Sequence, residues 1–195
     1  TMARLPDLEV FARQHELKIG TIADLIAFRS HNESLVQRIG ARQVGTPAGP
    51  FECIAFRDRG DGLHLALTHG SWTAADEVLV RVHEPFTAMD LLDVASAHSW
   101  PLPQALSALH ASPAGIAVLL NCGQGIETLL PQVLPGLAPA EIPRAQVDLR
   151  TYGIGAQILR ELGVARMKLL GRPRKMPSMT GYGLEVTGFI TQPAH

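Results

Sequence analysis

Three short segments, separated by turn-forming residues, constrain the fold of this chain more than any other feature. They cover residues 51–57, 63–69 and 77–83, and the sequence DRGDG at residues 58–62 separates the first two. Short β-rich runs bounded by glycine and aspartate are typical of strands joined by tight turns. We therefore expect these segments to form a meander of strands.

Further strands and helices alternate after residue 83. Strand patterns recur at residues 115–121, 166–170 and 182–190. Helical patterns lie between them, at a capping box Thr87-x-x-Asp90, in a run that follows Pro101 and Pro103 and ends at Leu109, and at residues 152–162. This alternation predicts an α/β fold in which helices flank a mixed sheet.

The first 33 residues are expected to form a helix pair. Residues 7–14 have helical spacing, and Thr21-x-x-Asp24 resembles a second capping box after Gly20. Helix, turn, helix is therefore the expected order in this part of the chain.

A linker or turn is predicted to follow the helix pair. Residues 34–41 are polar and mixed, and the chain is then punctuated by Gly45, Pro47, Gly49 and Pro50. We place a domain boundary at residue 33, so that residues 1–33 form one unit and residues 34–195 a second.

Charge and hydropathy exclude several partners. A formal net charge of -1 provides no global field that would attract nucleic acid or an anionic membrane surface. Apolar runs such as residues 115–120 are far too short to span a membrane, and the N-terminus lacks a secretory signal pattern. Cys53 and Cys122 are far apart in the sequence and fit reduced thiols. We expect a cytoplasmic protein with no nucleic-acid or membrane partner.

Residues 147–186, VDLRTYGIGAQILRELGVARMKLLGRPRKMPSMTGYGLEV, resemble the C-terminal part of a GTP cyclohydrolase II domain from riboflavin biosynthesis. The segment VRVH at residues 80–83 also matches an R-x-H motif of that family. The resemblance implies a GTP cyclohydrolase II-like fold for residues 34–195. It also implies a homodimer, because the family is usually dimeric.

Residues 2–29, MARLPDLEVFARQHELKIGTIADLIAFR, resemble the end of a 3,4-dihydroxy-2-butanone 4-phosphate synthase domain, which precedes the cyclohydrolase domain in fused riboflavin proteins. The resemblance implies that Thr1 is an internal residue of a longer parent and that a fused synthase domain is a partner. The acidic catalytic loop of that synthase is not visible here, so we expect the parent, and not this fragment, to perform the synthase reaction.

The cysteines that bind zinc in the cyclohydrolase family are missing from this sequence. The family motif Ser-Glu-Cys-Leu-Thr-Gly-Asp aligns with residues 84–90, which puts Phe86 at the cysteine, and the other two cysteines align with the stretch SAHSW at residues 96–100. The resemblance implies that zinc-bound water attacks the guanine ring, and catalytic zinc needs three protein ligands. We therefore expect no zinc cofactor and no cyclohydrolase activity.

A few site residues of the family are retained. Asp148 and Arg150 match a D-x-R motif of the family. The resemblance implies proton transfer by the aspartate and an action of the arginine on the α-phosphate. We interpret both here as vestigial catalytic residues. Arg81 and Lys175 match nucleotide-contacting positions. Asp148 has an alternative role as the cap of the helix that follows it.

Two alternative sites remain open. His83, His98 and Cys122 could form a substitute metal site, although their spacing gives no motif. The basic cluster around Arg172 and Arg174 could hold a nucleotide or a phosphate.

Three functions follow from these patterns. The first is an inactive cyclohydrolase-like domain with a structural or regulatory role for a fused synthase. The second is an active GTP cyclohydrolase II that opens the imidazole ring of GTP and releases formate and pyrophosphate. The third is a module that senses a nucleotide or a flavin.

Overall fold

The computed structural model describes residues 3–84, 86–92, 98–123, 149–174, 176 and 179–192. Within these ranges, none of the helices is long and apolar enough to cross a membrane.

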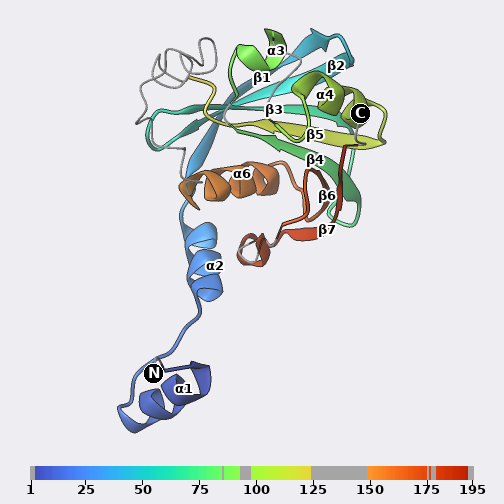
Figure 1. Ribbon diagram of the computed structural model, residues 1–195. Helices are drawn as coiled ribbons and strands as arrows, with labels where there is room; N and C mark the ends of the chain where they lie inside the picture. The colour runs from blue at the N-terminus through green and yellow to red at the C-terminus, as the bar shows by residue number, and fades with distance from the viewer. Residues whose placement is uncertain are drawn as a thin grey trace, which may run out of the picture.

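A mixed sheet organises the described part of the chain (Figure 1). It has seven strands in the order β1-β2-β3-β5-β4-β6-β7. Their bounds are β1 Val36–Thr46, β2 Gly49–Asp58, β3 Leu63–Gly70, β4 Glu77–His83, β5 Ala114–Leu119, β6 Arg166–Leu170 and β7 Glu185–Ile190. The mixed α/β fold expected from the sequence is confirmed.

The expected meander is right for β2 and β3 and wrong for β4. β2 and β3 pair antiparallel around the predicted turn, but β5 lies between β3 and β4 in the sheet. β4 pairs parallel with β5 on one side and with β6 on the other. The reason is that helical segments connect β4 to β5, and such a crossover lets two consecutive strands run parallel.

The predicted linker at residues 34–50 is largely a strand. β1 pairs with β2 from Val36 to Thr46, with one shift of register between Arg38 and Gly40, and the hairpin closes from Thr46 to Gly49. β1 has one sheet neighbour and most of its side chains are exposed, so its sequence carries no apolar alternation. The prediction of a linker from polar composition is therefore wrong for this segment.

The described helices are α1 Leu5–Gln14, α2 Ile22–Asn32, α3 Met89–Leu92, α4 Leu102–His110 and α6 Leu149–Glu161, with a 3₁₀ turn, η1, at Met179–Tyr182. α4 and α6 pack on opposite faces of the sheet, whereas α1 and α2 extend away from it (Figure 1). The expected helix pair is present as α1 and α2, and the backbone N–H of Asp24 donates to Thr21 Oγ1 at 3.0 Å, as a capping box predicts. The last strand begins at Glu185 instead of residue 182 because η1 precedes it.

Two apolar cores lie on opposite faces of the sheet, one under α6 and one under α4 (Figure 1). β5 contributes to both: Ile116 and Val118 belong to the α6 core, and Ala117 and Leu119 to the α4 core. A central strand with a helix on each face is buried on both sides, which explains its unbroken apolar run.

The segment between α2 and β1 is anchored to α6 by one side chain. The Gln157 carbonyl Oε1 accepts from the backbone N–H of Leu35 at 2.5 Å, and its Nε2 donates to the Glu33 carbonyl at 3.2 Å. These two bonds fix the end of α2 relative to the sheet.

Candidate functional site

A cavity of about 400 Å³ opens beside the carboxyl ends of β4 and β6, under α6. Its lining combines charged residues with apolar side chains of α6, β6 and η1. The polar and aromatic lining residues are Arg81, Glu84, His98, Ser99, Tyr152, Arg172, Arg174 and Phe189. The carboxyl ends of parallel strands in an open α/β sheet are the usual place for a ligand site.

Arg81, on β4, lines this cavity, and its guanidinium also binds the backbone of two other segments. Its side chain is buried, with 6% of the residue exposed. One terminal nitrogen donates to the Leu170 carbonyl at 3.0 Å and the other to the Trp100 carbonyl at 3.2 Å. Burial lowers the pKa of Arg81 to about 10, with repulsion from Arg174 as the second cause, and the attraction of Asp90 does not compensate. Arg81, which was expected to contact a nucleotide, therefore uses both terminal guanidinium nitrogens to bind backbone carbonyls.

His83, Asp90 and His98 form a compact cluster next to the cavity. His83 is fully buried and Asp90 is 5% exposed. Asp90 Oδ1 lies 3.0 Å from His83 Nε2 and 3.4 Å from His98 Nε2, and the two imidazole centroids are 4.0 Å apart. Three potential metal ligands are thus gathered from β4, α3 and the segment before α4.

The electrostatics of the cluster keep its members in the forms that can bind a cation. Burial lowers the pKa of His83 to about 4, with repulsion from His98 as the next cause, and the Asp90 carboxylate does not offset them. Burial would raise the pKa of Asp90, but a hydrogen bond from the Thr87 backbone and the nearby His83 outweigh it and lower that pKa. His83 is therefore neutral and Asp90 ionised near neutral pH.

Two of the three residues considered from the sequence as a substitute metal site lie together in the structure. His83 and His98 are brought together, but the third potential ligand in the group is Asp90, and Cys122 is outside it. The Cys122 thiol contacts the Leu119 carbonyl at 3.4 Å, and burial raises its pKa to about 11. Sequence reasoning treated Asp90 only as half of a capping box, a role that uses one carboxylate oxygen and leaves the other available.

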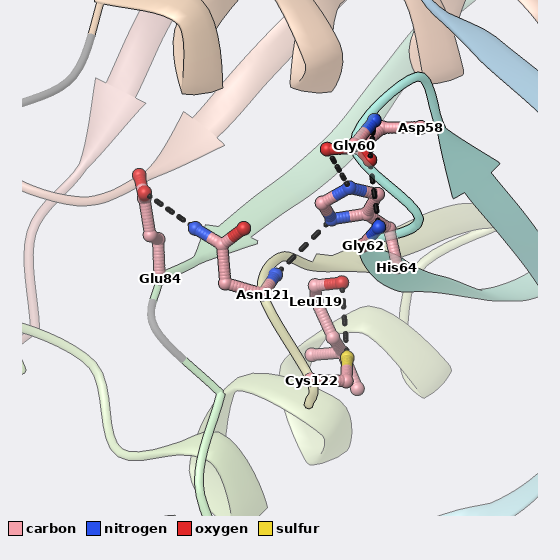
Figure 2. A network of polar contacts seen from close by, with 8 residues as sticks. All are labelled: Asp58, Gly60, Gly62, His64, Glu84, Leu119, Asn121 and Cys122. Carbon is pink, nitrogen blue, oxygen red and sulfur yellow. Dashed lines mark hydrogen bonds and ion pairs between the residues drawn. The ribbon is translucent and has the colours of Figure 1, made fainter. Parts of the chain in front are cut away.

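A second polar network begins at the β2–β3 turn (Figure 2). Asp58 Oδ1 accepts from the backbone N–H groups of Gly60 and Gly62 at 2.8 and 2.7 Å. Asp58 Oδ2 lies 3.4 Å from Nε2 of His64, which is fully buried. Burial lowers the pKa of His64, and the Asp58 carboxylate offsets this effect only in part.

The network continues from His64 toward the cavity (Figure 2). His64 Nδ1 accepts from the backbone N–H of Asn121 at 3.1 Å, and the Asn121 side chain donates to Glu84 Oε1 at 3.0 Å. Glu84 lines the cavity. The chain of contacts therefore ties the end of β5 to both the β2–β3 turn and the cavity wall, and sequence patterns gave no signal for it.

Phe86 occupies the position where the resemblance places the first zinc-binding cysteine. Its backbone N–H donates to the Leu120 carbonyl at 3.0 Å, and its side chain packs against the apolar core under α4. Its ring centroid lies 6.5 Å from that of His83. A thiolate zinc site of the kind the resemblance implies does not fit these residues, because an aromatic side chain fills the position of a ligand.

The remaining predicted site residues are only partly described. Asp148 and Lys175 lie outside the described residues. Arg150 is in the first turn of α6, but its side chain is among those not described. Their assigned roles therefore stay predictions.

Comparison with known proteins gives the family. The family model "GTP cyclohydrolase II" matches residues 37–191. A 3,4-dihydroxy-2-butanone 4-phosphate synthase of Neisseria meningitidis serogroup B is 45% identical over 190 residues, covering 97% of this chain and 52% of the relative. The riboflavin biosynthesis protein RibBA of Aquifex aeolicus is 39% identical over 207 residues, covering 95% and 49%.

A solved structure agrees with these sequence matches. RibBX of A. baumannii, described as a two-domain 3,4-dihydroxy-2-butanone 4-phosphate synthase, is 34% identical, with a TM-score of 0.56 over 98% of this chain and 51% of that one. The chain thus spans about half the length of the relatives it matches. With its family-model match over residues 37–191, this chain belongs to the GTP cyclohydrolase II family.

Proposed function

We propose that this domain lacks GTP cyclohydrolase activity and has a structural or regulatory role for a fused 3,4-dihydroxy-2-butanone 4-phosphate synthase in riboflavin biosynthesis. The observation that carries the proposal is Phe86, a partly buried aromatic side chain that packs against the α4 core at the position expected for a zinc thiolate. Hydrolysis at the guanine ring needs a strong nucleophile near neutral pH, and a zinc ion supplies one only when protein ligands hold it.

The two cysteines of the chain do not restore such a site. Both are free and partly buried, and burial raises the pKa of both thiols. Because zinc binds the thiolate and not the thiol, a raised pKa weakens cysteine as a ligand.

The partnership with a synthase domain has two supports. Two of the relatives described above are themselves synthases, and this chain matches only about half of each. In addition, α1 and α2 expose large apolar side chains, among them Ile22 at 79% and Phe28 at 67%. Exposed apolar surface of this kind marks a contact with another protein surface, and a fused synthase or a second protomer would cover it.

The test compares the full-length parent protein with a version that ends after residue 33 of this numbering. We expect the truncation to change the synthase rate, the oligomeric state or the melting temperature, because the proposed role acts through contacts with the synthase. If all three stay at the values of the full-length protein, the proposal is wrong. A parallel assay incubates the full-length protein with GTP and zinc, and release of formate would contradict the proposed inactivity.

The cavity supports a second candidate, the binding of a nucleotide or a flavin as a signal. Its volume of about 400 Å³ is in the range of small-molecule sites. Arg172 and Arg174 line it, and the Arg174 guanidinium lies 5.0 Å from the centroid of the Tyr152 ring. Arginines can bind a phosphate through paired hydrogen bonds, while the apolar wall accommodates a ring system.

Isothermal titration with GTP and with flavin mononucleotide tests this candidate. Arg172→Ala should weaken binding at least tenfold, whereas Arg57→Ala, which changes an exposed arginine on β2, should not. If neither compound binds the unmodified chain, the sensing function is excluded for both.

A further inference from the structure

We propose that His83, Asp90 and His98 form a binding site for a divalent transition-metal ion of the zinc type. The donor set is two imidazoles and a carboxylate, and it involves neither Phe86 nor either cysteine. The site's role is structural: it ties the end of β4 to α3 and to His98 before α4. Such a site does not require cyclohydrolase activity.

The distances between the donor atoms are those of a coordination site. Ligand atoms about 2.1 Å from a metal are about 3.4 Å apart at tetrahedral angles and about 3.0 Å apart at right angles. Asp90 Oδ1 lies 3.0 Å from His83 Nε2 and 3.4 Å from His98 Nε2. One donor atom from each of the three residues lies within 4.8 Å of the others. A metal ion therefore fits with small side-chain adjustments.

His83 is also a buried donor in need of a partner. Neither of its ring nitrogens makes a hydrogen bond within the described part of the chain, although the imidazole is fully buried. Asp90 Oδ1 lies 3.0 Å from Nε2 without forming a hydrogen bond to it. An unsatisfied buried polar group is costly, and a metal ion on Nε2 would remove part of that cost.

Asp90 is held in place for this role. Its Oδ2 accepts from the Thr87 backbone N–H at 2.7 Å and from Thr87 Oγ1 at 3.0 Å. These bonds orient the carboxylate and leave Oδ1 directed at the two histidines. Hydrogen bonds to the second oxygen of a ligating carboxylate are the usual way in which a protein orients a metal ligand.

The three ligands come from separate parts of the fold. His83 ends β4, Asp90 lies in α3, and His98 precedes α4. A bound ion would cross-link these parts, and it would stabilise the folded chain in proportion to its affinity. Imidazole and carboxylate ligands suit zinc and its first-row neighbours better than magnesium or calcium.

The experiment uses the full chain with any affinity tag removed, stripped with a chelator and then equilibrated with Zn²⁺. Metal content is measured by elemental analysis after gel filtration, and the melting temperature is measured with and without Zn²⁺. Replacement by Co²⁺ adds a visible spectrum that reports imidazole coordination. We expect about one ion per chain and, at free zinc 100 times the dissociation constant, a rise in Tm of about 5–10 °C.

The variants decide whether this cluster is responsible. His98→Gln and Asp90→Asn should each weaken zinc binding at least tenfold and remove most of the Tm shift. His69→Gln is the matched control, because His69 is a partly buried histidine on β3 outside the cluster. Zinc retention that is equal in all the variants, or no retention by the unmodified chain, would overturn the proposal.

The zinc experiment can fail independently of the test of the proposed function. A chain that binds zinc and releases no formate from GTP supports both proposals. Release of formate by the zinc-loaded chain would refute the proposed inactivity and leave the metal site intact, whereas a chain without zinc would refute only the metal site.

Discussion

Replacing Gly115 with alanine should push α4 outward from the sheet and destabilise the fold. Gly115 lies on the central strand β5, directly under the last turn of α4. A Cβ at this position would be 2.5 Å from the Leu109 carbonyl oxygen and 2.9 Å from both the Leu109 carbonyl carbon and Cβ. Since most of these atoms are backbone, no side-chain rotation relieves the overlap.

The size of the effect follows from these distances. Contacts become ordinary at 3.4 Å, so α4 must move by about 0.9 Å, the difference between 3.4 and 2.5 Å. Overpacking a well-packed core costs about 1–3 kcal/mol, and a backbone overlap belongs at the upper end. We expect the free energy of unfolding to fall by about 3 kcal/mol and Tm by about 6–12 °C.

Urea unfolding followed by circular dichroism measures this change, with Gly188→Ala as the control. Gly188 is also a strand glycine, but among the described residues a Cβ there would meet only the flexible Lys168 side chain, at 3.5 Å. The control should stay within about 0.5 kcal/mol of the unmodified chain or be slightly more stable. Equal stabilities of the two variants would show that the contact between α4 and β5 is not as close as described.

Three further predictions concern the site. Arg81→Ala should lower the free energy of unfolding by about 2–4 kcal/mol in urea, because the buried carbonyl acceptors of Leu170 and Trp100 lose a charged donor; a loss below about 0.5 kcal/mol would contradict this reading. His64 has a lowered pKa in the folded state, so its contribution to stability is present above pH 6.5 and is lost as the pH falls below it. Accordingly, His64→Gln should flatten the dependence of unfolding free energy on pH below about 6.5, and an unchanged slope would argue against a neutral buried imidazole. Phe86→Cys should leave formate release from GTP undetectable in the presence of zinc, because the other two thiolate ligands that the family's site needs are still missing, and should cost about 1–3 kcal/mol in lost packing; detectable formate would refute this.

Much of the fold could be read from local patterns. The strands at β2, β3 and β6, the helices α4 and α6, and the capping box at Thr87 follow from periodicity and capping residues. β1 could not be read in this way, because an exposed strand with a single sheet neighbour needs no apolar alternation. The strand order was also inaccessible, because the insertion of β5 between β3 and β4 depends on contacts between residues far apart in the chain.

The candidate site was also predictable only in part. The sequence singled out His83 and His98 by residue type and by their place near the aligned cysteines. It could not show that Asp90 completes the group, since only the packing of α3 brings Oδ1 toward both imidazoles. Nor could it show that Arg81 is bound to two backbone carbonyls, because their positions depend on the pairing of β6 with β4 and on the start of α4.

The sequence by itself determined the family, the place of the strand β5 in the chain and the loss of the cysteines, because motif identity and apolar runs are properties of neighbouring residues. The tertiary structure alone decided the order of the strands, the two hydrogen bonds from Arg81 to backbone carbonyls and the proximity of His83, Asp90 and His98. The physical reason is that hydrogen bonds and coordination depend on distances of a few ångströms. Between residues distant in sequence, only the packed fold sets those distances.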